Sequence, residues 1–321
     1  MLGICLAALS AATFAFNNAS ARRGVLTGSV LQGLAVTVPI GVPIFLLATL
    51  ATGNLASLPR YSGEAIGLLM LAGVLHFVLG RYGNFRASQA IGTNQSAPVI
   101  QLGLGLTLAL AVLVLKETLT PLRILGIALL ALGPALMRSG EPGSSARLKF
   151  EPRFAEGYAF ALLAAAAYGM SPILVRLALV SGDLGSGLVG GLVSYAAATV
   201  VVALLMLWPG QLRHTLAIAP ESLKWFAYSG VSVCIAQMFV YMAFTVAPIS
   251  VIMPILQLHL ALRVLFARLL NPHHEIFGSR TMLGTALSLL GALVISLDTE
   301  FFLRLLPLPD WLAAFARWHW P

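Results

Sequence analysis

The sequence predicts an all-α, polytopic membrane protein of about ten transmembrane helices, arranged as two inverted five-helix repeats. Two observations predict this fold class: a very apolar composition and an internal duplication. Hydrophobic residues make up 59% of the 321-residue chain and charged residues only 9%, whereas a soluble domain carries about 25% charged residues. The mean hydropathy is +0.92. Lipid is therefore the expected solvent for most of the chain.

Long apolar runs predict the individual spans. A bilayer core about 30 Å thick takes about 20 apolar residues per helix, and lipid leaves the peptide groups no partner outside the helix. The runs are too continuous for the alternating pattern of a membrane barrel. The predicted spans are residues 2–21, 29–52, 65–86, 93–115, 121–138, 156–178, 186–208, 223–244, 247–270 and 279–298.

The first run ends in Ala19-Ser20-Ala21, which resembles a signal-peptide cleavage site. No basic segment precedes this run, and the basic pair Arg22-Arg23 follows it, so we interpret it as a retained first span.

A polar stretch divides the chain near its middle. The segment RSGEPGSSARLKFEPRFAE carries Gly, Pro, Ser and charges of both signs, as a solvated linker does. We predict a first repeat over residues 1–138, a linker over 139–155, a second repeat over 156–298 and a tail over 299–321. The tail is rich in Trp and interrupted by Pro, so it is expected to lie in the headgroup region rather than to span.

Markers of the first half recur in the second half in the same order and at nearly constant spacing, which indicates a duplication. Gly3, Phe14 and Arg22 match Gly157, Tyr168 and Arg176; Phe85, Ala87 and Pro98 match Tyr241, Ala243 and Pro254; Glu117, Gly126 and Gly133 match Glu275, Gly284 and Gly291. Because each repeat holds an odd number of spans, the second copy must enter the membrane from the opposite face. Both termini then lie on the same side, and a substrate site is expected near the midplane, between the repeats.

The segment NFRASQAIGTNQSAPVIQLGLGLTLALAVLVLKETLTPLRILGIALLALG resembles the EamA-type repeat of the drug/metabolite transporter superfamily. That repeat has an Ala near the end of span three, a Pro in span four, a Glu just after it and a Gly-x6-Gly span five. These are Ala87, Pro98, Glu117, Gly126 and Gly133, and in the second copy Ala243, Pro254, Glu275, Gly284 and Gly291. The resemblance covers about residues 1–298. The second copy has two more residues between its Pro and Glu, and the aromatic tail has no counterpart.

The resemblance implies a secondary transporter, with export of a small metabolite or amphipathic compound as the usual task of the family. A flippase for a lipid-linked or polyprenyl-linked small molecule and a membrane-embedded enzyme are the alternatives. No HExxH or GxSxG motif is present, so we expect no enzyme, and also no cofactor and no metal. The expected location is a bacterial cytoplasmic membrane, with several passes.

Charge adds two expectations. The net charge is +8, but the basic residues separate apolar runs instead of clustering on one face, so nucleic acid is not an expected partner. A positive-inside count puts the central linker in the cytoplasm and both termini outside, whereas members of the family commonly have both termini in the cytoplasm. The sequence leaves the orientation, and also the oligomeric state, open.

Polar residues inside spans are the candidate substrate ligands, together with polar residues near helix ends or bends, because intramembrane polar groups are expensive and often functional. The resemblance places helices one, three, four, six, eight and nine around a central cavity, and the candidates belong to these helices. They are Asn17, Asn18, His76, Asn94, Tyr168, Gln237, Tyr241, Gln257, His259 and Arg263. Each can also be a packing or capping group, and Arg263 can snorkel toward the interface. If Arg263 faces the cavity, an anionic substrate group is its natural partner.

The remaining assignments are structural. Pro98 and Pro254 are predicted to bend or break matching helices, Pro39 and Pro43 to kink the second span, and Gly126 and Gly284 to pack helices closely. All carboxylates lie at span ends or in loops, which disfavours proton relay through a buried carboxylate. Glu117 and Glu275 are expected to cap the starts of spans five and ten.

Overall fold

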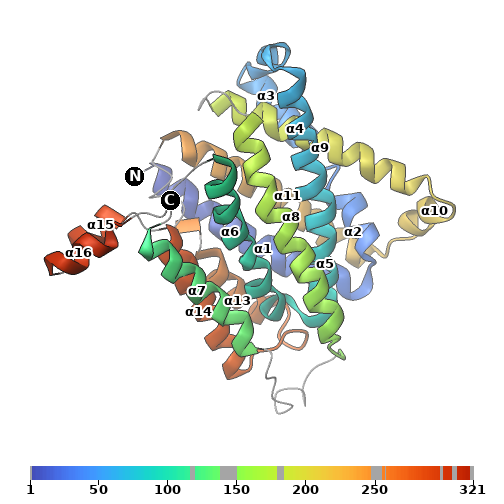
Figure 1. Cartoon of the computed structure of the whole chain (residues 1–321). Helices are drawn as coiled ribbons and strands as arrows, with labels where there is room; N and C mark the ends of the chain where they lie inside the picture. The colour runs from blue at the N-terminus through green and yellow to red at the C-terminus, as the bar shows by residue number, and fades with distance from the viewer. Residues whose placement is uncertain are drawn as a thin grey trace.

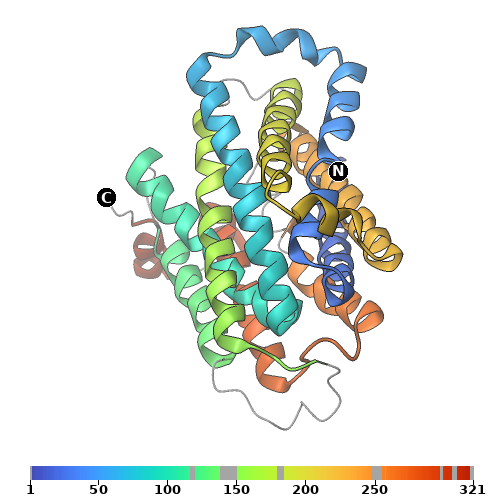
Figure 2. The ribbon, with the colours of Figure 1, turned by 90° about the vertical axis from the view of Figure 1, so that its right-hand side faces the viewer.

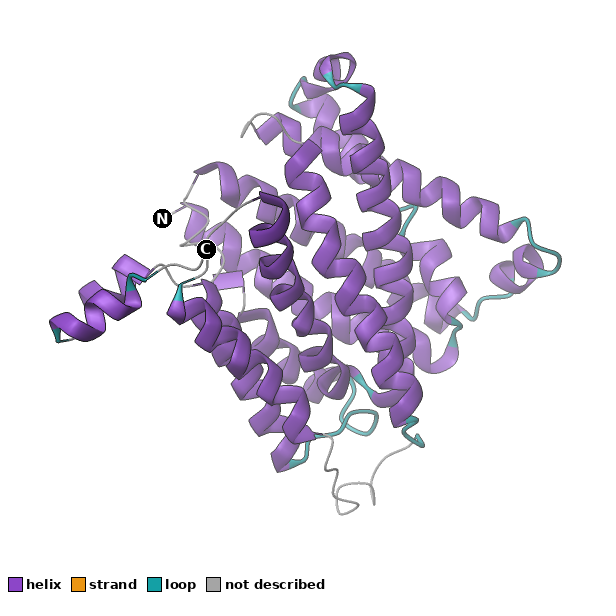
Figure 3. Cartoon of the chain, in the orientation of Figure 1, coloured by secondary structure: helices purple, strands orange, loops and turns teal. Residues whose placement is uncertain are grey.

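The computed structural model describes residues 2–115, 120–137, 150–178, 184–246, 255–256, 258–296, 299–305 and 309–318. Within these ranges the chain is helical, with loops but no strand, which confirms the predicted all-α class (Figure 3). The long helices lie side by side in one bundle (Figure 1).

In the first half, serine side chains cap the starts of two helices. The helices are α1 (Leu2–Thr27), α2 (Val30–Thr37), α3 (Gly41–Ala51), the 3-10 helix η1 (Asn54–Arg60), α4 (Gly63–Gly73), the π-helix η2 (Val74–Gly80), α5 (Arg81–Ile91), α6 (Thr93–Leu115) and α7 (Pro121–Met137). Ser29 and Gln32 form a capping box at the start of α2, and Ser62 caps α4. The predicted second span is divided around Pro39, because proline cannot donate a helical hydrogen bond.

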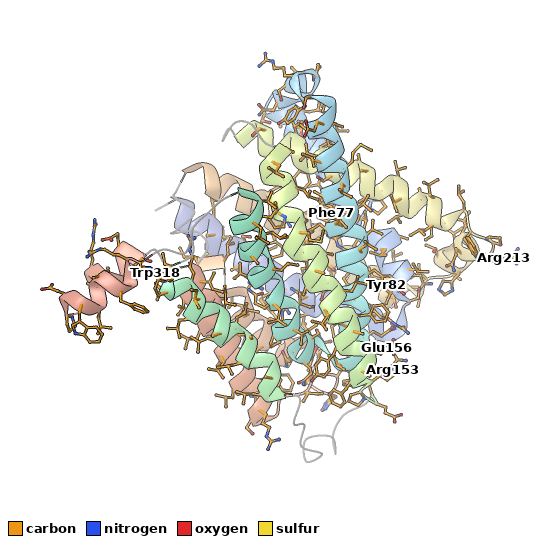
Figure 4. The ribbon with its side chains drawn as sticks, viewed as in Figure 1. Phe77, Tyr82, Arg153, Glu156, Arg213 and Trp318 are labelled. Carbon is orange, nitrogen blue, oxygen red and sulfur yellow. The ribbon has the colours of Figure 1, made fainter. Side chains whose placement is uncertain are left out.

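The second half contains α8 (Phe154–Ala178), α9 (Leu184–Met206), α10 (Gln211–Leu216), α11 (Pro220–Val246), α13 (Leu258–Leu270) and α14 (Ser279–Ser296). Two short helices follow, α15 (Thr299–Leu305) and α16 (Asp310–Ala316), and they lie outside the bundle beside Trp318 (Figures 1 and 4). Neither is long enough to span a bilayer, since a span takes about 20 residues.

Within the described residues, four helical stretches are long and apolar enough to cross a membrane: Val30–Ala51, Gly63–Ile91, Phe154–Val175 and Gly185–Met206. Shorter apolar helices cover Pro121–Gly133 and Ser279–Ile295. The outside of the bundle carries exposed leucines, of which Leu47, Leu204 and Leu207 are 66%, 60% and 77% exposed. An outer surface of this kind is suited to lipid rather than water.

Small residues bring the helices together inside the bundle. A Cβ added to Gly103 on α6 would lie 2.5 Å from the Ala165 carbonyl oxygen on α8, and one on Gly83 would lie 2.7 Å from the Phe160 carbonyl oxygen. Close backbone approach at small residues is the usual basis of helix packing in lipid. α1 packs against α11 and α13, α8 packs against η2, α5 and α6, and α7 packs against α14 (Figure 2).

Two arginines differ from their expected role as membrane-flanking charges. Arg22 is fully buried and Arg81 is 5% exposed. α4, η2 and α5 form one continuous helical stretch, Gly63–Ile91. Arg81 lies 10 residues (91 − 81) before the end of this stretch at Ile91, which is about 15 Å at 1.5 Å per residue. Arg81 therefore does not belong in the positive-inside count.

Candidate functional site

A continuous set of polar side chains lies inside the bundle, between α1, the α4–η2–α5 stretch, α8, α11 and α13. We call it the interior polar cluster. Its members are Asn17, Asn18, His76, Arg81, Asn84, Tyr168, Ser171, Ser229 and Arg263. Both halves of the chain contribute to it.

His76 lies on the π-helical segment η2, which brings it toward α8. Its Nδ1 lies 2.7 Å from the Ser171 Oγ, and its ring lies 4.6 Å from the Tyr168 ring, centroid to centroid. π-helical turns are rare and frequently occur at functional sites. Next to His76, Phe77 stacks on Tyr195 of α9 at 3.8 Å, and Tyr195 in turn stacks on Phe45 of α3. This aromatic packing fixes the helix that carries His76.

Arg81 follows the π-helical segment directly. Its guanidinium donates to the Thr37 carbonyl oxygen at 2.9 Å and to the Tyr195 hydroxyl at 3.3 Å. The Phe77 ring lies 5.3 Å from its guanidinium carbon, within the range of a cation–π interaction. Thus neutral groups satisfy Arg81, and no described carboxylate forms an ion pair with it.

Tyr168 is the centre of the interior polar cluster. Its hydroxyl interacts with the Asn84 side chain and electrostatically with both Arg81 and Arg263. Asn84 in turn donates to the Asn18 Oδ1 at 3.3 Å. Asn17 next to it accepts a hydrogen bond from Ser229 on α11 at 2.7 Å. The phenol and the amides of the cluster can both donate and accept hydrogen bonds.

Arg263 and His259 occupy successive turns of α13. His259 donates from Nδ1 to the Leu256 carbonyl oxygen at 2.8 Å, and its ring faces Phe14 at 6.4 Å. A local backbone partner of this kind fits a packed imidazole. Arg263 is 6% exposed, and its buried Nε has no hydrogen-bond partner.

A second polar network lies where α5 ends and α6 begins. The Glu275 side chain is 2% exposed and accepts hydrogen bonds from the backbone N–H groups of Thr93 and Asn94. Arg22 donates to the carbonyl oxygens of His274, Ser88 and Gln89 and lies beside Glu275. Glu275 therefore caps α6, and the expectation that it caps the helix that follows it in sequence is wrong.

The structure places the other predicted residues as follows. Asn94 belongs to the Glu275 network and not to the interior polar cluster. Gln237 is partly buried on α11. Tyr241 belongs to the same helix, but its side chain lies outside the described residues. Gln257 and Pro254 also lie outside the described residues. α6 continues past Pro98 without a break. Gly126 and Gly284 lie at the contact between α7 and α14.

Sequence reasoning did not include Arg81, Asn84, Ser171 and Ser229 among the candidate residues. Arg81 is an ionisable residue inside the predicted span 65–86, several residues before its end. This position could have identified it as a candidate, because ionisable residues inside a span are often functional. Serines and asparagines in apolar helices are common packing groups, so sequence alone does not separate the members of the cluster.

Long apolar helices, an outer surface of leucine and a polar interior define a polytopic α-helical membrane protein. Residues 1–139 match the EamA-like transporter family. This match confirms the predicted resemblance to the EamA-type repeat of the drug/metabolite transporter superfamily over these residues.

The search of solved structures adds the fold. One chain, titled only "Crystal structure of protein", is similar to this one with a TM-score of 0.50 and 18% sequence identity. The match covers 94% of this chain and 98% of the other. At this identity the similarity concerns the fold alone. No curated protein sequence matches.

Proposed function

We propose that this protein is a secondary transporter that moves a small metabolite or amphipathic compound by alternating access between two inverted repeats. Family membership supports a transporter of the drug/metabolite type. The observation that carries the proposal is the interior polar cluster, because polar side chains from both halves meet deep inside an apolar bundle. Intramembrane polar groups of this kind mark substrate pathways.

The glycines of α7 and α14 support the inverted duplication. In the proposed repeat, Gly126 corresponds to Gly284 and Gly133 corresponds to Gly291. A Cβ on Gly126 would lie 2.9 Å from the Gly291 carbonyl oxygen, and one on Gly133 would lie 2.6 Å from the Gly284 carbonyl oxygen. Each contact is therefore the counterpart of the other. A two-fold axis between two equivalent helices produces this pairing.

The neighbours of the first helix in each half support the same arrangement. α1 opens the first proposed repeat and packs against α11 and α13, the third and fourth spans of the second. α8 opens the second proposed repeat and packs against η2, α5 and α6, the third and fourth spans of the first. In this arrangement the proposed repeats, residues 1–138 and 156–298, enclose the cluster between them.

Transport can be tested with the protein reconstituted in liposomes. Vesicles loaded with unlabelled amino acids, sugars or organic acids are exposed to the labelled solute, and counterflow is measured for wild type, Asn84→Ala and Leu204→Ala. Asn84 belongs to the interior polar cluster, whereas Leu204 lies on the outer surface. We expect counterflow in wild type and Leu204→Ala and a strong reduction in Asn84→Ala.

The same vesicles test the alternatives. Transbilayer movement of a lipid-linked sugar without solute counterflow would favour the flippase. Chemical conversion of a solute without its movement would favour a membrane-embedded enzyme. Either outcome would overturn the proposed carrier.

A further inference from the structure

Arg263 is a buried cation that forms no direct ion pair within the described part of the chain. It is 6% exposed, its Nε is buried and has no hydrogen-bond partner, and it makes no ion pair with any described residue. Other arginines of the described chain are satisfied: Arg22 lies beside Glu275, and Arg86 lies 2.5 Å from Glu156. An unpaired guanidinium inside a membrane bundle is unfavourable unless a ligand completes it.

Snorkelling does not account for this side chain. From Arg263 to the end of α13 at Leu270 is 7 residues (270 − 263), or about 10 Å, which a long side chain can largely cover. Arg268, one turn further along the same helix, is exposed. Arg263 instead remains buried, and the Tyr168 hydroxyl is among the groups that it interacts with. Its guanidinium is therefore held inside the bundle, within electrostatic reach of both Glu275 and Tyr168.

Two groups act electrostatically on Arg263, the Glu275 carboxylate and the Tyr168 hydroxyl. Tyr168 interacts electrostatically with both Arg263 and Arg81, so one hydroxyl lies under the influence of two guanidinium groups. Glu275 also acts on Arg263, but its oxygens accept hydrogen bonds from Thr93 and Asn94, and it forms an ion pair with Arg22. Within the described residues, the cluster itself therefore has two cations and no carboxylate.

We propose that Arg263, together with Tyr168 and Arg81, binds an anionic oxygen group, a carboxylate or a phosphate, on the transported molecule. A guanidinium presents a planar fork of N–H donors that matches both groups. The Tyr168 hydroxyl supplies a further donor, and Arg81, held by Thr37 and Tyr195, adds positive potential without having to move. The inference rests on the proposed transport function and names its substrate class. The anionic group can belong to a soluble metabolite or to a lipid headgroup.

Binding is tested apart from transport. The purified full-length protein in a neutral detergent is titrated with succinate, inorganic phosphate and glycerol 3-phosphate, with glycerol as the neutral control, and ligand-induced thermal stabilisation is measured. The variants are Arg263→Gln, Arg263→Lys and Arg268→Gln, which changes an exposed arginine on the same helix. We expect an anion to stabilise wild type and Arg268→Gln, with about tenfold or greater loss of apparent affinity in Arg263→Gln and a smaller loss in Arg263→Lys.

Tyr168→Phe keeps the ring and removes the hydroxyl, so it tests the site even if Arg263→Gln does not fold. We expect about a tenfold loss of anion affinity in this variant. A headgroup source is distinguished with nanodiscs of neutral lipid to which phosphatidylglycerol is added. Arg263-dependent stabilisation by this lipid, without any by the soluble anions, assigns the site to a headgroup.

Two results overturn the inference. One is an anion affinity that Arg263→Gln leaves equal to that of wild type, or the absence of binding to wild type of both the soluble anions at millimolar concentration and phosphatidylglycerol. The other is counterflow of neutral or cationic solutes that Arg263→Gln leaves unchanged, which removes the anion site and leaves the carrier intact. If wild type shows no counterflow of any solute but still binds the anion through Arg263, the proposed carrier is wrong and the anion site remains.

Discussion

Glu275 and Arg22 join the two halves of the chain: the Arg22 Nε lies 3.7 Å from the Glu275 Oε1, and both side chains are fully buried. The same oxygen accepts hydrogen bonds from the Thr93 N–H at 2.8 Å and the Thr93 hydroxyl at 2.7 Å, and Oε2 accepts one from the Asn94 N–H at 3.0 Å. A carboxylate here satisfies the free N–H groups at the start of α6 and is favoured by the helix dipole.

Replacing Glu275 by Gln is therefore expected to destabilise the protein by about 2–4 kcal/mol, because a buried cation loses its counter-ion. The measurement is thermal unfolding in detergent. Glu221→Gln is the control, since Glu221 and Lys224 form an exposed pair. A transition temperature as high as that of the control would show that the carboxylate charge contributes little.

Gly92 allows the close approach of Glu275. Its φ is +81°, and an added Cβ would lie 2.6 Å from the Glu275 Oε2. Because its ψ is 164°, Gly92 occupies a region that is essentially restricted to glycine, so Gly92→Ala should combine backbone strain of about 1–3 kcal/mol with displacement of the capping carboxylate. Gly53→Ala is the control for a positive φ alone, because Gly53 lies in the left-handed helical region with φ +70° and ψ 5° and has nothing within 4 Å of the Cβ position. Similar losses of thermal stability in the two variants would contradict the steric part of this prediction.

The contact between α7 and α14 should also be sensitive to the size of the side chains in it. A Cβ on Gly133 would overlap the Ser288 hydroxyl, so Gly133→Ala is expected to lower stability by about 1–3 kcal/mol through overpacking. A Cβ on Gly105 of α6 would find its nearest neighbour, a Leu130 methyl group, at 3.9 Å. Gly105→Ala should be neutral or slightly stabilising, since Ala favours helix by about 1 kcal/mol over Gly. The comparison uses thermal unfolding of both variants, and the idea fails if their order is reversed.

The tail carries a pH-dependent contact. The Arg317 Nε donates to the Glu300 Oε1 at 2.8 Å, and this bond lowers the pKa of Glu300 below its ordinary value of 4.5. The contact is therefore fully present above that value and is lost as the pH falls through the lowered pKa. Spin labels on α15 and α16 should report a constant distance at neutral pH and separation only in stronger acid. Glu300→Gln should show a distance that does not change over this range.

Much of the fold was predictable because each span is a long apolar run with recognisable ends. The predicted run 93–115 coincides with α6, and the run 121–138 begins at the first residue of α7. The count of ten spans, the domain boundaries and the inverted repeats remain predictions. The partition of the second span followed from Pro39. The π-helical form of η2 was not predictable, because its sequence is apolar like its neighbours and its hydrogen-bond pattern depends on packing against α8 and α9.

The candidate site was predictable in part. His76, Tyr168, Asn17, Asn18 and Arg263 lie in one cluster, and they are polar residues in apolar helices. Their roles as ligands remain predictions. Asn94 was assigned to the same group, but its N–H belongs to the cap formed by Glu275, a residue 181 positions away in sequence. Such a long-range partner leaves no local pattern, so sequence reasoning placed Glu275 at the nearest helix start instead.

The π-helical turn between Val74 and Gly80 also affects how relatives are compared. A turn with i to i+5 hydrogen bonds accommodates an extra residue, and one extra residue rotates everything after it by about 100° around the axis. A single helical wheel drawn through the whole stretch therefore assigns the residues on one side of the π-helical turn, before or after it, to the wrong face of the helix. Relatives in which the helix is regular will need a one-residue gap here before their equivalents of Arg81 and Asn84 can be identified.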